Sequence, residues 1–581
     1  MGNWYKSGAP WIWLTAGAVS ISLIAVLGLL LLIAGRGLSY FWPSPVYEWQ
    51  LQNKQGTSVL IGQLYDRETL SAARLADAGM VSDTADSAPQ SLTRYLVKTG
   101  NRERVGLDFR WINGSDIISR TAPAALAQIE RSKNGNFYGY PVALVLDGKT
   151  ISLAKDKAHT LAPDSAEPEH ALSAKSTTTS LSRQAFRHAV AQQVARAVSL
   201  NQQAQRLQQQ DIGAINYQLE QLRLQQRRDE LNGHLSEERL AELEVTKEQL
   251  NSRYQLLEQQ FFSLRQAAGQ DKLIVRDMLG DNVSLPLSQV LAVTYPNTLS
   301  WLEKLKLWGK GMLGFVTDDP REANTEGGVF PAIFGTVFMV LLMAVIVTPF
   351  GVIAAIYLHE YAGNGPITRM IRIAVINLAG VPSIVYGVFG LGFFVYMLGG
   401  SLDQLFYPEA LPSPTFGSPG VLWSALTLAI LTLPVVIVST EEGLSRIPSA
   451  VRHGSLALGA TKAETLWRIV IPMASPAIMT GLILAVARAA GEVAPLMLVG
   501  VVKLAPTLPV DLNFPFVHLE RKFMHLGFHI YDVGFQSPNV EAARPLVYAT
   551  SFLLVSVIVA LNLTAITVRN HLREKYRALE H

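Results

Sequence analysis

Two charged residues, Arg488 and Glu492, lie four positions apart in the otherwise apolar stretch Ile478–Val502. In a helix this spacing puts both side chains on one face. A charge at the centre of a bilayer costs at least about 2.5–3.5 kcal/mol, so such residues persist where they pair or line a wet cavity. A guanidinium binds oxyanions in a bidentate manner, and a carboxylate beside it would either weaken that hold or pair with a basic residue on a partner subunit. We predict that this pair lines an anion path; the alternative is an ion pair that locks helix packing.

A second pattern lies between Glu441 and Pro472, where two short helical runs are separated by Gly459. A turn of small residues between two short helices makes a compact knob at the membrane surface. Such a knob can press into a groove on a partner and transmit a rigid-body motion. The alternative is an ordinary amphipathic loop between two membrane spans.

Three histidines, His518, His525 and His529, could suggest a metal site. They lack the tight spacing of a ligand set. We therefore expect surface histidines and no metal.

The composition excludes most enzymatic chemistry. There is no cysteine, which excludes disulfides, thiolate metal sites and a cysteine nucleophile. Lys and Arg number 49 against 46 for Asp and Glu, which gives no reason to expect nucleic-acid binding. A nucleotide-binding loop needs G-x-x-x-x-G-K-[ST], and before Gly148-Lys149-Thr150 the first glycine is replaced by Ala143. We predict no catalytic residue and no cofactor in this chain.

Charged residues make up 16% of the chain and hydrophobic residues 49%, whereas soluble domains carry about 25% charge. A helix needs about 20 apolar residues to cross a bilayer. Six stretches qualify: Trp11–Ala34, Val329–Leu358, Ile373–Leu402, Val421–Thr440, Ile478–Val502 and Pro545–Val568. The Lys and Arg bias of the short loops predicts that both termini are cytoplasmic and that residues 37–328 lie outside.

The outer region 37–328 reads as an α+β domain. Strand-like runs fill 47–161, including Tyr95–Lys98, Val105–Phe109 and Val142–Leu146, and Asp147-Gly148 signals a hairpin. A Ser-, Thr- and Pro-rich linker is expected at Ala162–Thr179. Two long antiparallel helices, broken at Asn232-Gly233, are expected over 182–267, where leucines and aromatics follow a heptad seam. The seam consists of Leu240, Leu243, Leu250, Tyr254, Leu257, Phe261 and Leu264.

After this arm, strands are expected again at Leu273–Arg276 and Asn282–Leu285. The amphipathic segment Leu299–Val316 is expected to lie at the outer membrane–water interface. Together these two parts form the section 272–316 of the outer domain.

The segment between Glu441 and Pro472 resembles part of a known protein family. The spacing from Gly459 to Ile469, Ile471 and Pro472 resembles the EAA coupling loop of ABC importer permeases, with His453-Gly454-Ser455 where that family has Glu-Ala-Ala. The segments Asn377–Gly387, Thr440–Leu444 and Arg488–Leu496 resemble phosphate-importer permeases of the PstA kind. The resemblance covers about Val329–Val568, and the anchor and outer domain fit a long form by architecture.

The resemblance implies the permease subunit of an ATP-driven importer of inorganic phosphate in the bacterial inner membrane, working by alternating access. It also implies a PstC-type second permease subunit, a periplasmic phosphate-binding protein, and an ATPase dimer that carries ATP and Mg²⁺. The residues it assigns to ATPase coupling are Glu441, Glu442, His453, Gly454, Ser455, Gly459, Ala460, Thr461, Ile469 and Pro472. Alternatives are a permease for molybdate or sulfate, or a membrane-anchored periplasmic coiled-coil scaffold or sensor.

The predicted fold is thus a mainly α membrane protein with six transmembrane helices of ABC importer permease type. A large periplasmic α+β domain carries the long antiparallel helical arm. The expected order is an anchor at 1–36, the periplasmic domain at 37–328, the permease domain at 329–568 with its coupling loop at 441–472, and a basic cytoplasmic tail at 569–581.

Overall fold

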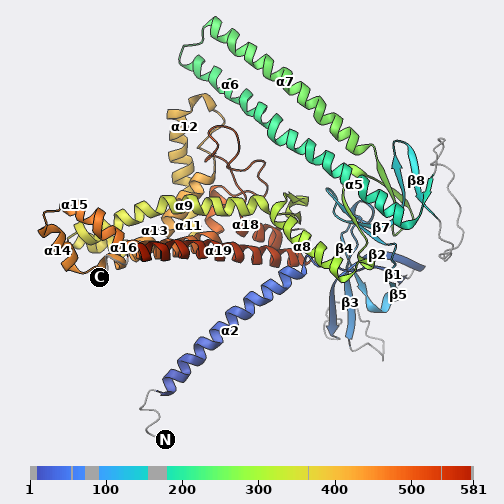
Figure 1. Cartoon of the computed structure of the whole chain (residues 1–581), viewed down its shortest axis with the longest axis horizontal. Coiled ribbons are helices and arrows are strands. Elements are labelled where there is room, and N and C mark those ends of the chain that lie inside the picture. Colours follow the sequence, from blue (N-terminus) through green and yellow to red (C-terminus); the bar gives the residue numbers. More distant parts are fainter. Residues whose placement is uncertain are drawn as a thin grey trace, which may run out of the picture. The chain divides into compact units, whose positions relative to one another are not determined.

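The computed structural model describes residues 9–53, 56–71, 91–154, 179–363, 365–537 and 540–576. The chain divides into two compact units (Figure 1). Unit 1 comprises Met1–Phe41 and Met312–His581, and unit 2 comprises Trp42–Gly311. The predicted linker at Ala162–Thr179 lies outside the described residues except at its last position. The end of the predicted basic tail also lies outside the described residues.

Unit 1 carries the membrane helices. Among the described residues, six helices are long and apolar enough to cross a bilayer: Trp11–Ser39, Phe330–Tyr361, Ser383–Phe406, Val421–Ser445, Lys462–Gly491 and Ala543–His571. Each overlaps one of the six predicted apolar stretches, so the prediction of six membrane helices is confirmed.

The helical elements of unit 1 follow this order. The N-terminal helix is α2 (Ala9–Ser39), and the second span is α9 (Phe330–Ile356) with the π-helical segment η6 (Tyr357–Tyr361). Next come α10 (Pro366–Leu378), α11 (Ser383–Phe389), η7 (Gly390–Gly399), α12 (Gly400–Phe406), α13 (Val421–Ser445), α14 (Ser449–Ala457), α15 (Lys462–Thr465), η9 (Leu466–Val470), α16 (Ile471–Gly491), α17 (Ala494–Val499), α18 (Leu526–Tyr531), η10 (Asp532–Gln536) and α19 (Val540–Tyr576).

Two predicted spans have the wrong limits. The third was expected at Ile373–Leu402, but α10 ends at Leu378 and the membrane helix begins at Ser383. Pro382 explains this, because proline disfavours helical backbone in the residue before it. The fifth was expected at Ile478–Val502, but its helix runs over Lys462–Gly491.

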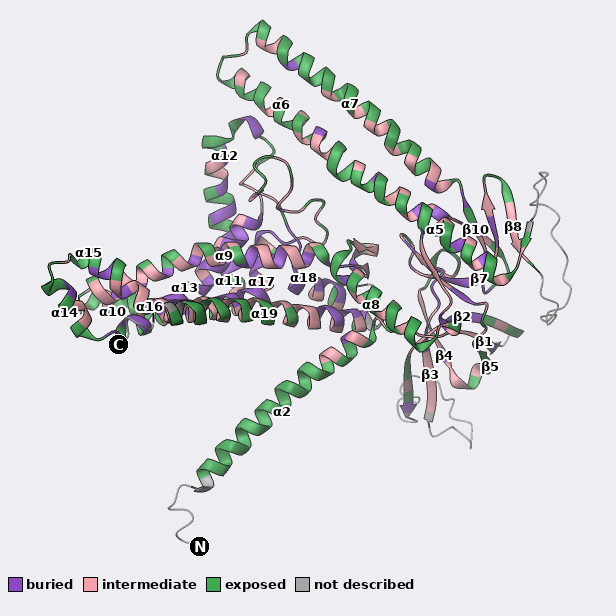
Figure 2. Cartoon of the chain, in the orientation of Figure 1, coloured by how far each residue is buried: buried purple, intermediate pink, exposed green. Residues whose placement is uncertain are grey.

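The span α13 lies at the centre of this bundle (Figure 2). In its most apolar stretch of 18 residues, 67% of the residues are buried. Glycines let its neighbours approach closely. A Cβ atom on Gly351 of α9 would lie 2.6 Å from Val436 Cγ1, and one on Gly481 of α16 would lie 2.8 Å from Ser439 Cβ. Helices in lipid associate through such small-residue contacts, because lipid tails provide no hydrophobic driving force between them.

The helix α2 differs from the central spans because its apolar side chains are exposed, including Trp13 and Leu31 (Figure 2). It contacts α19 near its C-terminal end, where Gly37 is buried and a Cβ atom would lie 2.9 Å from the carbonyl oxygen of Tyr548. Its exposed apolar surface suits a lipid environment.

Unit 2 contains two antiparallel sheets. The first has the order β4-β3-β2-β1-β5, made of β1 (Val46–Asn53), β2 (Gly56–Ser71), β3 (Ser91–Lys98), β4 (Phe109–Asn113) and β5 (Ile117–Thr121). The second has the order β11-β10-β7-β6-β12, with β8 paired to β7 and β9 parallel to β8. Its strands are β6 (Ala127–Arg131), β7 (Phe137–Leu146), β8 (Lys149–Leu153), β9 (Thr179–Leu181), β10 (Lys272–Arg276), β11 (Asn282–Pro286) and β12 (Val290–Thr294).

The hairpin prediction is confirmed. The strands β7 and β8 pair on either side of Asp147 and Gly148, whose φ angles are 44° and 78°. Such left-handed backbone in both turn residues is what a tight two-residue hairpin requires. The strand prediction at Val105–Phe109 is wrong, because Arg102–Val105 forms the short helix α4 and β4 begins only at Phe109.

Long helices separate β9 from β10 in unit 2. The helix α5 (Arg183–Arg206) continues through the π-helical segment η2 (Leu207–Ile212) into α6 (Gly213–Leu231), and α7 (Glu237–Gly269) returns antiparallel to it (Figure 1). Phe186, Val190 and Val194 of α5 are buried against the second sheet. The turn contains Gly233 at a φ of 69°. Along α7 the seam residue Leu243 is buried, and its other members are half-buried.

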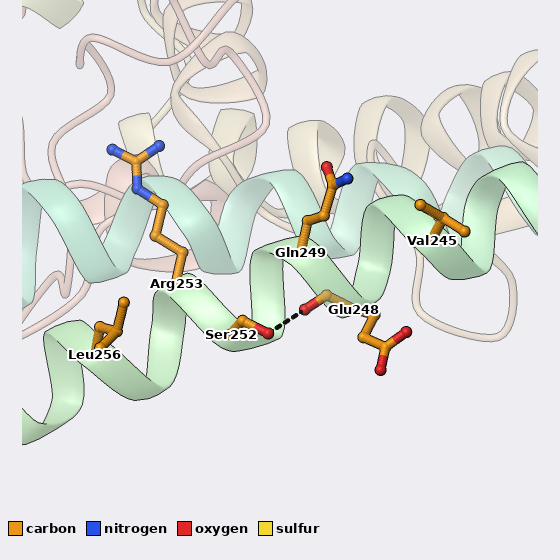
Figure 3. A pocket seen from close by; sticks show the side chains of 6 residues that line it. All are labelled: Val245, Glu248, Gln249, Ser252, Arg253 and Leu256. Carbon is orange, nitrogen blue, oxygen red and sulfur yellow. Dashed lines mark hydrogen bonds between the residues drawn. The ribbon is translucent and has the colours of Figure 1, made fainter.

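A shallow depression lies on the outer surface of α7 (Figure 3). Its residues are Val245, Glu248, Gln249, Ser252, Arg253 and Leu256. The Ser252 hydroxyl donates a hydrogen bond to the carbonyl oxygen of Glu248, 2.9 Å away. Because all six side chains come from one helix, the depression is open and has no opposing wall.

The close contact between α9 and α13 generates a prediction. Replacing Gly351 with alanine should lower the free energy of unfolding by about 1–3 kcal/mol, because the new Cβ atom must displace Val436. Thermal unfolding of the purified chain in detergent measures this change. The matched control is Gly392→Ala, since a Cβ atom there meets nothing within 4 Å. Equal stability of the two variants would contradict the packing argument.

Candidate translocation and coupling site

The two charged residues of the fifth span lie at the end of its helix. Arg488 is in the last turn of α16, whereas Glu492 follows that helix in extended backbone with φ −78° and ψ 133°. The prediction that both residues share one helical face is therefore wrong for Glu492. They remain neighbours, since Arg488 Nε lies 3.6 Å from Glu492 Oε1.

The break in the helix is local and short. The helix resumes as α17 at Ala494, with Pro495 in its first turn. There α17 contacts α11 so closely that a Cβ atom on Gly387 would lie 2.7 Å from Pro495 Cα. Non-helical backbone at membrane depth is tolerated where protein or a water-filled cavity surrounds it. The break thus interrupts the helix directly beside the charged pair.

The loop between α13 and α16 forms a knob of two short helices. As predicted, α14 and α15 are separated at Gly459, whose φ is +88°. The Thr461 side chain caps α15 in a reciprocal capping box with Glu464. Ser455 and Thr465 join the two helices through buried hydroxyls 2.8 Å apart. These bonds give the knob a defined shape.

The residues assigned to coupling fall into several environments. Glu441 and Glu442 lie in the end of α13, while Ile469 and Pro472 lie in the continuous helix of η9 and α16. The connection between the spans is therefore shorter than the predicted 441–472. Ser455 is buried, Glu441, Ala460, Ile469 and Pro472 are half-buried, and the exposed members are Glu442, His453, Gly454, Gly459 and Thr461.

Sequence reasoning missed the ion-pair network that holds the knob. Arg452 donates hydrogen bonds to the carbonyl oxygens of Leu444, at 2.7 Å, and Ile447, at 3.0 Å. Its Nε lies 3.1 Å from Glu360 Oε1, and Lys462 donates to the carbonyl oxygen of Glu360. Glu360 lies in η6, at the end of the second span. The available signal was an acidic residue directly after an apolar stretch.

A second ion pair connects the neighbouring helices. Arg372 of α10 lies 2.6 Å from Glu441 of α13, measured from Nη2 to Oε1. Arg372 also donates to the carbonyl oxygen of Leu358, 3.3 Å away. The ends of α9, α10 and α13 are thereby joined at the base of the knob.

The knob and the helical segment that follows it expose two large apolar side chains. Leu458, directly after α14, is 91% exposed, and Trp467 of η9 is 74% exposed. Charged side chains of α15, Lys462 and Glu464, are exposed in the same segment. Exposed large apolar side chains beside polar ones are typical of an interaction site.

The three histidines lie in the loop before α18, at its N-cap and within α18, and the prediction that they lie on the surface is wrong. His518, His525 and His529 are all buried. His518 Nε2 lies 3.0 Å from Asp511 Oδ1, and its Nδ1 lies 3.2 Å from Glu520. In the described part of the chain, no group of three or more His, Cys, Asp or Glu could hold a metal ion.

Burial shifts the pKa values of side chains in and before α18. It lowers the pKa of His525 to about 4 and that of His529 to about 4, although Asp532 opposes the shift at His529 and Lys503 adds to it. Burial also raises the pKa of Asp511, but Arg521 and the backbone N–H of Asn513 outweigh it and hold that pKa at about 2. The two histidines are therefore neutral near pH 7.

Comparison with known proteins gives a family. Residues 347–577 match the family described as binding-protein-dependent transport system inner membrane component. The phosphate transport system permease protein PstA of Mycobacterium leprae is 35% identical over 217 residues, which is 37% of this chain and 64% of that protein. PstA 1 of Mycobacterium tuberculosis strain H37Rv is 35% identical over 245 residues, 42% of this chain and 70% of that protein.

Two further similarities complete the comparison. The phosphate transport system permease protein PstC of Mesorhizobium japonicum is 34% identical over 188 residues, 31% of this chain and 57% of that protein. Among solved structures, an inward-facing MetNI methionine ABC transporter is similar over a region that covers 42% of this chain and 94% of the MetNI chain. Its identity of 16% and TM-score of 0.31 are too low to bear on fold or function.

The buried histidines generate a pH prediction. Their pKa of about 4 in the folded chain lies below the ordinary 6.5, so the unfolded chain binds protons more readily between these values. Stability is then fully present above pH 6.5 and is lost as the pH falls toward 4. The expected loss is about 1.4 kcal/mol per pH unit and histidine, measurable by unfolding in detergent at several pH values.

The control for this prediction uses two single variants. His529→Gln should flatten the pH dependence, because it removes one of the two depressed groups. His571→Gln, at an exposed position of α19, should leave the dependence unchanged. An unaltered slope in His529→Gln would show that this histidine does not carry the effect.

Proposed function

This chain belongs to the family of inner membrane components of binding-protein-dependent transport systems and is of PstA type, and from that premise we propose that it imports inorganic phosphate. The supporting similarities are the family match at residues 347–577 and two relatives named as phosphate permeases at 35% identity. In this proposal the chain is a non-catalytic permease subunit in the bacterial inner membrane.

One observation carries the proposed energy coupling, namely that the knob of α14 and α15 is held by polar contacts and that large apolar side chains are exposed beside it. Leu458 and Trp467 offer an exposed surface to a partner, while Arg452, Glu360 and Lys462 tie the knob to the ends of α13 and α9. The proposed partner is an ATPase dimer that binds ATP and Mg²⁺. Its closure pushes the knob, and the attached spans move with it in alternating access.

The proposed substrate path passes Arg488 and Glu492. Their side chains are 35% and 20% exposed, so neither is fully buried in unit 1. A guanidinium suits a phosphate anion because its planar fork donates two parallel hydrogen bonds to oxyanion oxygens. The carboxylate of Glu492 competes for the same cation and thereby favours release.

The further proposed partners follow from the family. A PstC-type permease subunit would complete the membrane pathway, and a periplasmic phosphate-binding protein would deliver the anion. The Lys and Arg bias of the short loops supports cytoplasmic termini. Unit 2 would then lie in the periplasm.

The path proposal predicts the phenotype of Arg488→Gln. This variant, in the assembled complex, should lose phosphate uptake by at least about tenfold, because a charged donor to the anion is removed in a site of low polarity. Uptake into vesicles measures the loss, with molybdate and sulfate as competitors that test the anion class. Arg569→Gln, a charge-matched change at the end of α19, should transport normally. Normal uptake by Arg488→Gln would overturn the assignment.

The coupling proposal predicts the phenotype of Leu458→Asp. A charge placed in the apolar docking surface should weaken ATPase binding by about tenfold or more. Co-purification of the ATPase and its ATP hydrolysis in the complex measure this effect. Leu512→Asp is the matched control, because Leu512 is 86% exposed but lies in the loop before α18. Retained ATPase binding by Leu458→Asp would show that the docking surface lies elsewhere.

A further inference from the structure

The helix α8 (Trp301–Thr317) presents an exposed apolar stripe. Trp301 and Leu302 are each 65% exposed, and Leu305, Leu313 and Val316 continue the stripe along one face. Trp301 and Leu302 precede Leu305 by four and three residues, Leu313 follows Leu305 by eight, and Val316 follows Leu313 by three. Spacings of three, four and eight place these side chains on one face of a helix. A stripe of this kind on a water-facing helix is typical of insertion into a membrane interface.

The end of α8 is fixed beside a membrane span. Phe315 is buried in one cluster with Val329 and Ala332, and its carbonyl oxygen accepts a hydrogen bond of 2.8 Å from the Val329 N–H. Val329 directly precedes α9, which crosses the membrane. The C-terminal end of α8 therefore lies beside the start of α9.

A cationic groove lies along the N-terminal half of the same helix, within unit 2. Its volume is about 590 Å³, and it is lined by three basic side chains, Arg187, Lys306 and Lys310. Lys306 and Lys310 are one helical turn apart and flank the exposed stripe. One carboxylate, Glu303, also lines the groove, but it accepts hydrogen bonds of 2.8 Å from the Ser300 N–H and hydroxyl. The groove therefore keeps a net positive charge.

Arg187 is held in position for recognition. Its guanidinium carbon lies 3.7 Å from the centre of the Tyr295 ring, and it donates a hydrogen bond of 2.6 Å to the carbonyl oxygen of Ala124. Stacking on an aromatic ring limits the freedom of the guanidinium. A preorganised planar donor suits a phosphate group better than a mobile ammonium does.

We propose that this groove binds the phosphate headgroup of an anionic phospholipid, with the acyl chains lying along the apolar stripe of α8. Arg187, Lys306 and Lys310 contact the phosphate, while Trp301 and Leu302 contact the interfacial part of the chains. The pairing of a cationic groove with an adjoining apolar stripe selects a lipid over a free anion. This role is independent of which substrate the permease transports.

The test measures lipid binding to the purified full-length chain by native mass spectrometry. After delipidation, the chain is titrated with phosphatidylglycerol and, separately, with phosphatidylcholine. Wild type should bind phosphatidylglycerol in preference, and the double variant Lys306→Gln/Lys310→Gln should weaken that binding at least about tenfold. Both lysines are exposed, so the variant retains the fold.

The control removes the same charge elsewhere, with Lys247→Gln on α7 and Lys304→Gln on the other side of α8. This control should bind phosphatidylglycerol like wild type. Equal binding of the two lipids, or an unchanged affinity in Lys306→Gln/Lys310→Gln, would overturn the proposal. Displacement of the lipid by excess inorganic phosphate would also overturn it, because the site would then be one for the free anion.

Discussion

Close backbone approach around α13 is the constraint on which unit 1 depends. Apolar side chains gain nothing from leaving lipid for one another, so helices in a membrane associate through tight packing. Glycines at the contacts of α13 with α9, η7 and α16 bring these helices closer together than a larger side chain would allow. A Cβ atom on Gly443 would lie 2.4 Å from that of Ala477, and one on Gly390 would lie 2.3 Å from Thr427 Oγ1. The result is a set of spans packed closely around α13.

The close packing of these spans bears on the proposed role of the knob of α14 and α15. The spans α13 and α16 are joined by a short connection, and Arg452 fastens it to the end of α13 and to Glu360 of η6. The two hydroxyls of Ser455 and Thr465 then fix α14 against α15. In the proposed coupling, a push on Leu458 or Trp467 would reach η6 and α13 through these contacts.

The sequence predicted the features that depend on local pattern. The six spans follow from apolar length alone, and the turn at Gly459 follows from a glycine between two helical runs. The features it missed depend on contacts distant along the chain. Burial of His525 and His529, and the pairing of Arg452 with Glu360, follow only from how helices assemble. The end of α16 at Gly491 was missed because the stretch to Val502 stays apolar, and hydropathy does not register a break in backbone conformation.

That break bears on the choice between an anion path and a structural lock. An ion pair that locks helices should be buried and close, since its stabilisation depends on exclusion of water. Arg488 and Glu492 instead lie 3.6 Å apart and are both partly exposed. They also lie in one chain segment, at the end of α16 and directly after it, so the pair does not tie two helices together. A partly exposed cation beside a break in the helix fits a binding position along a pathway, and this geometry supports the proposed path over the lock.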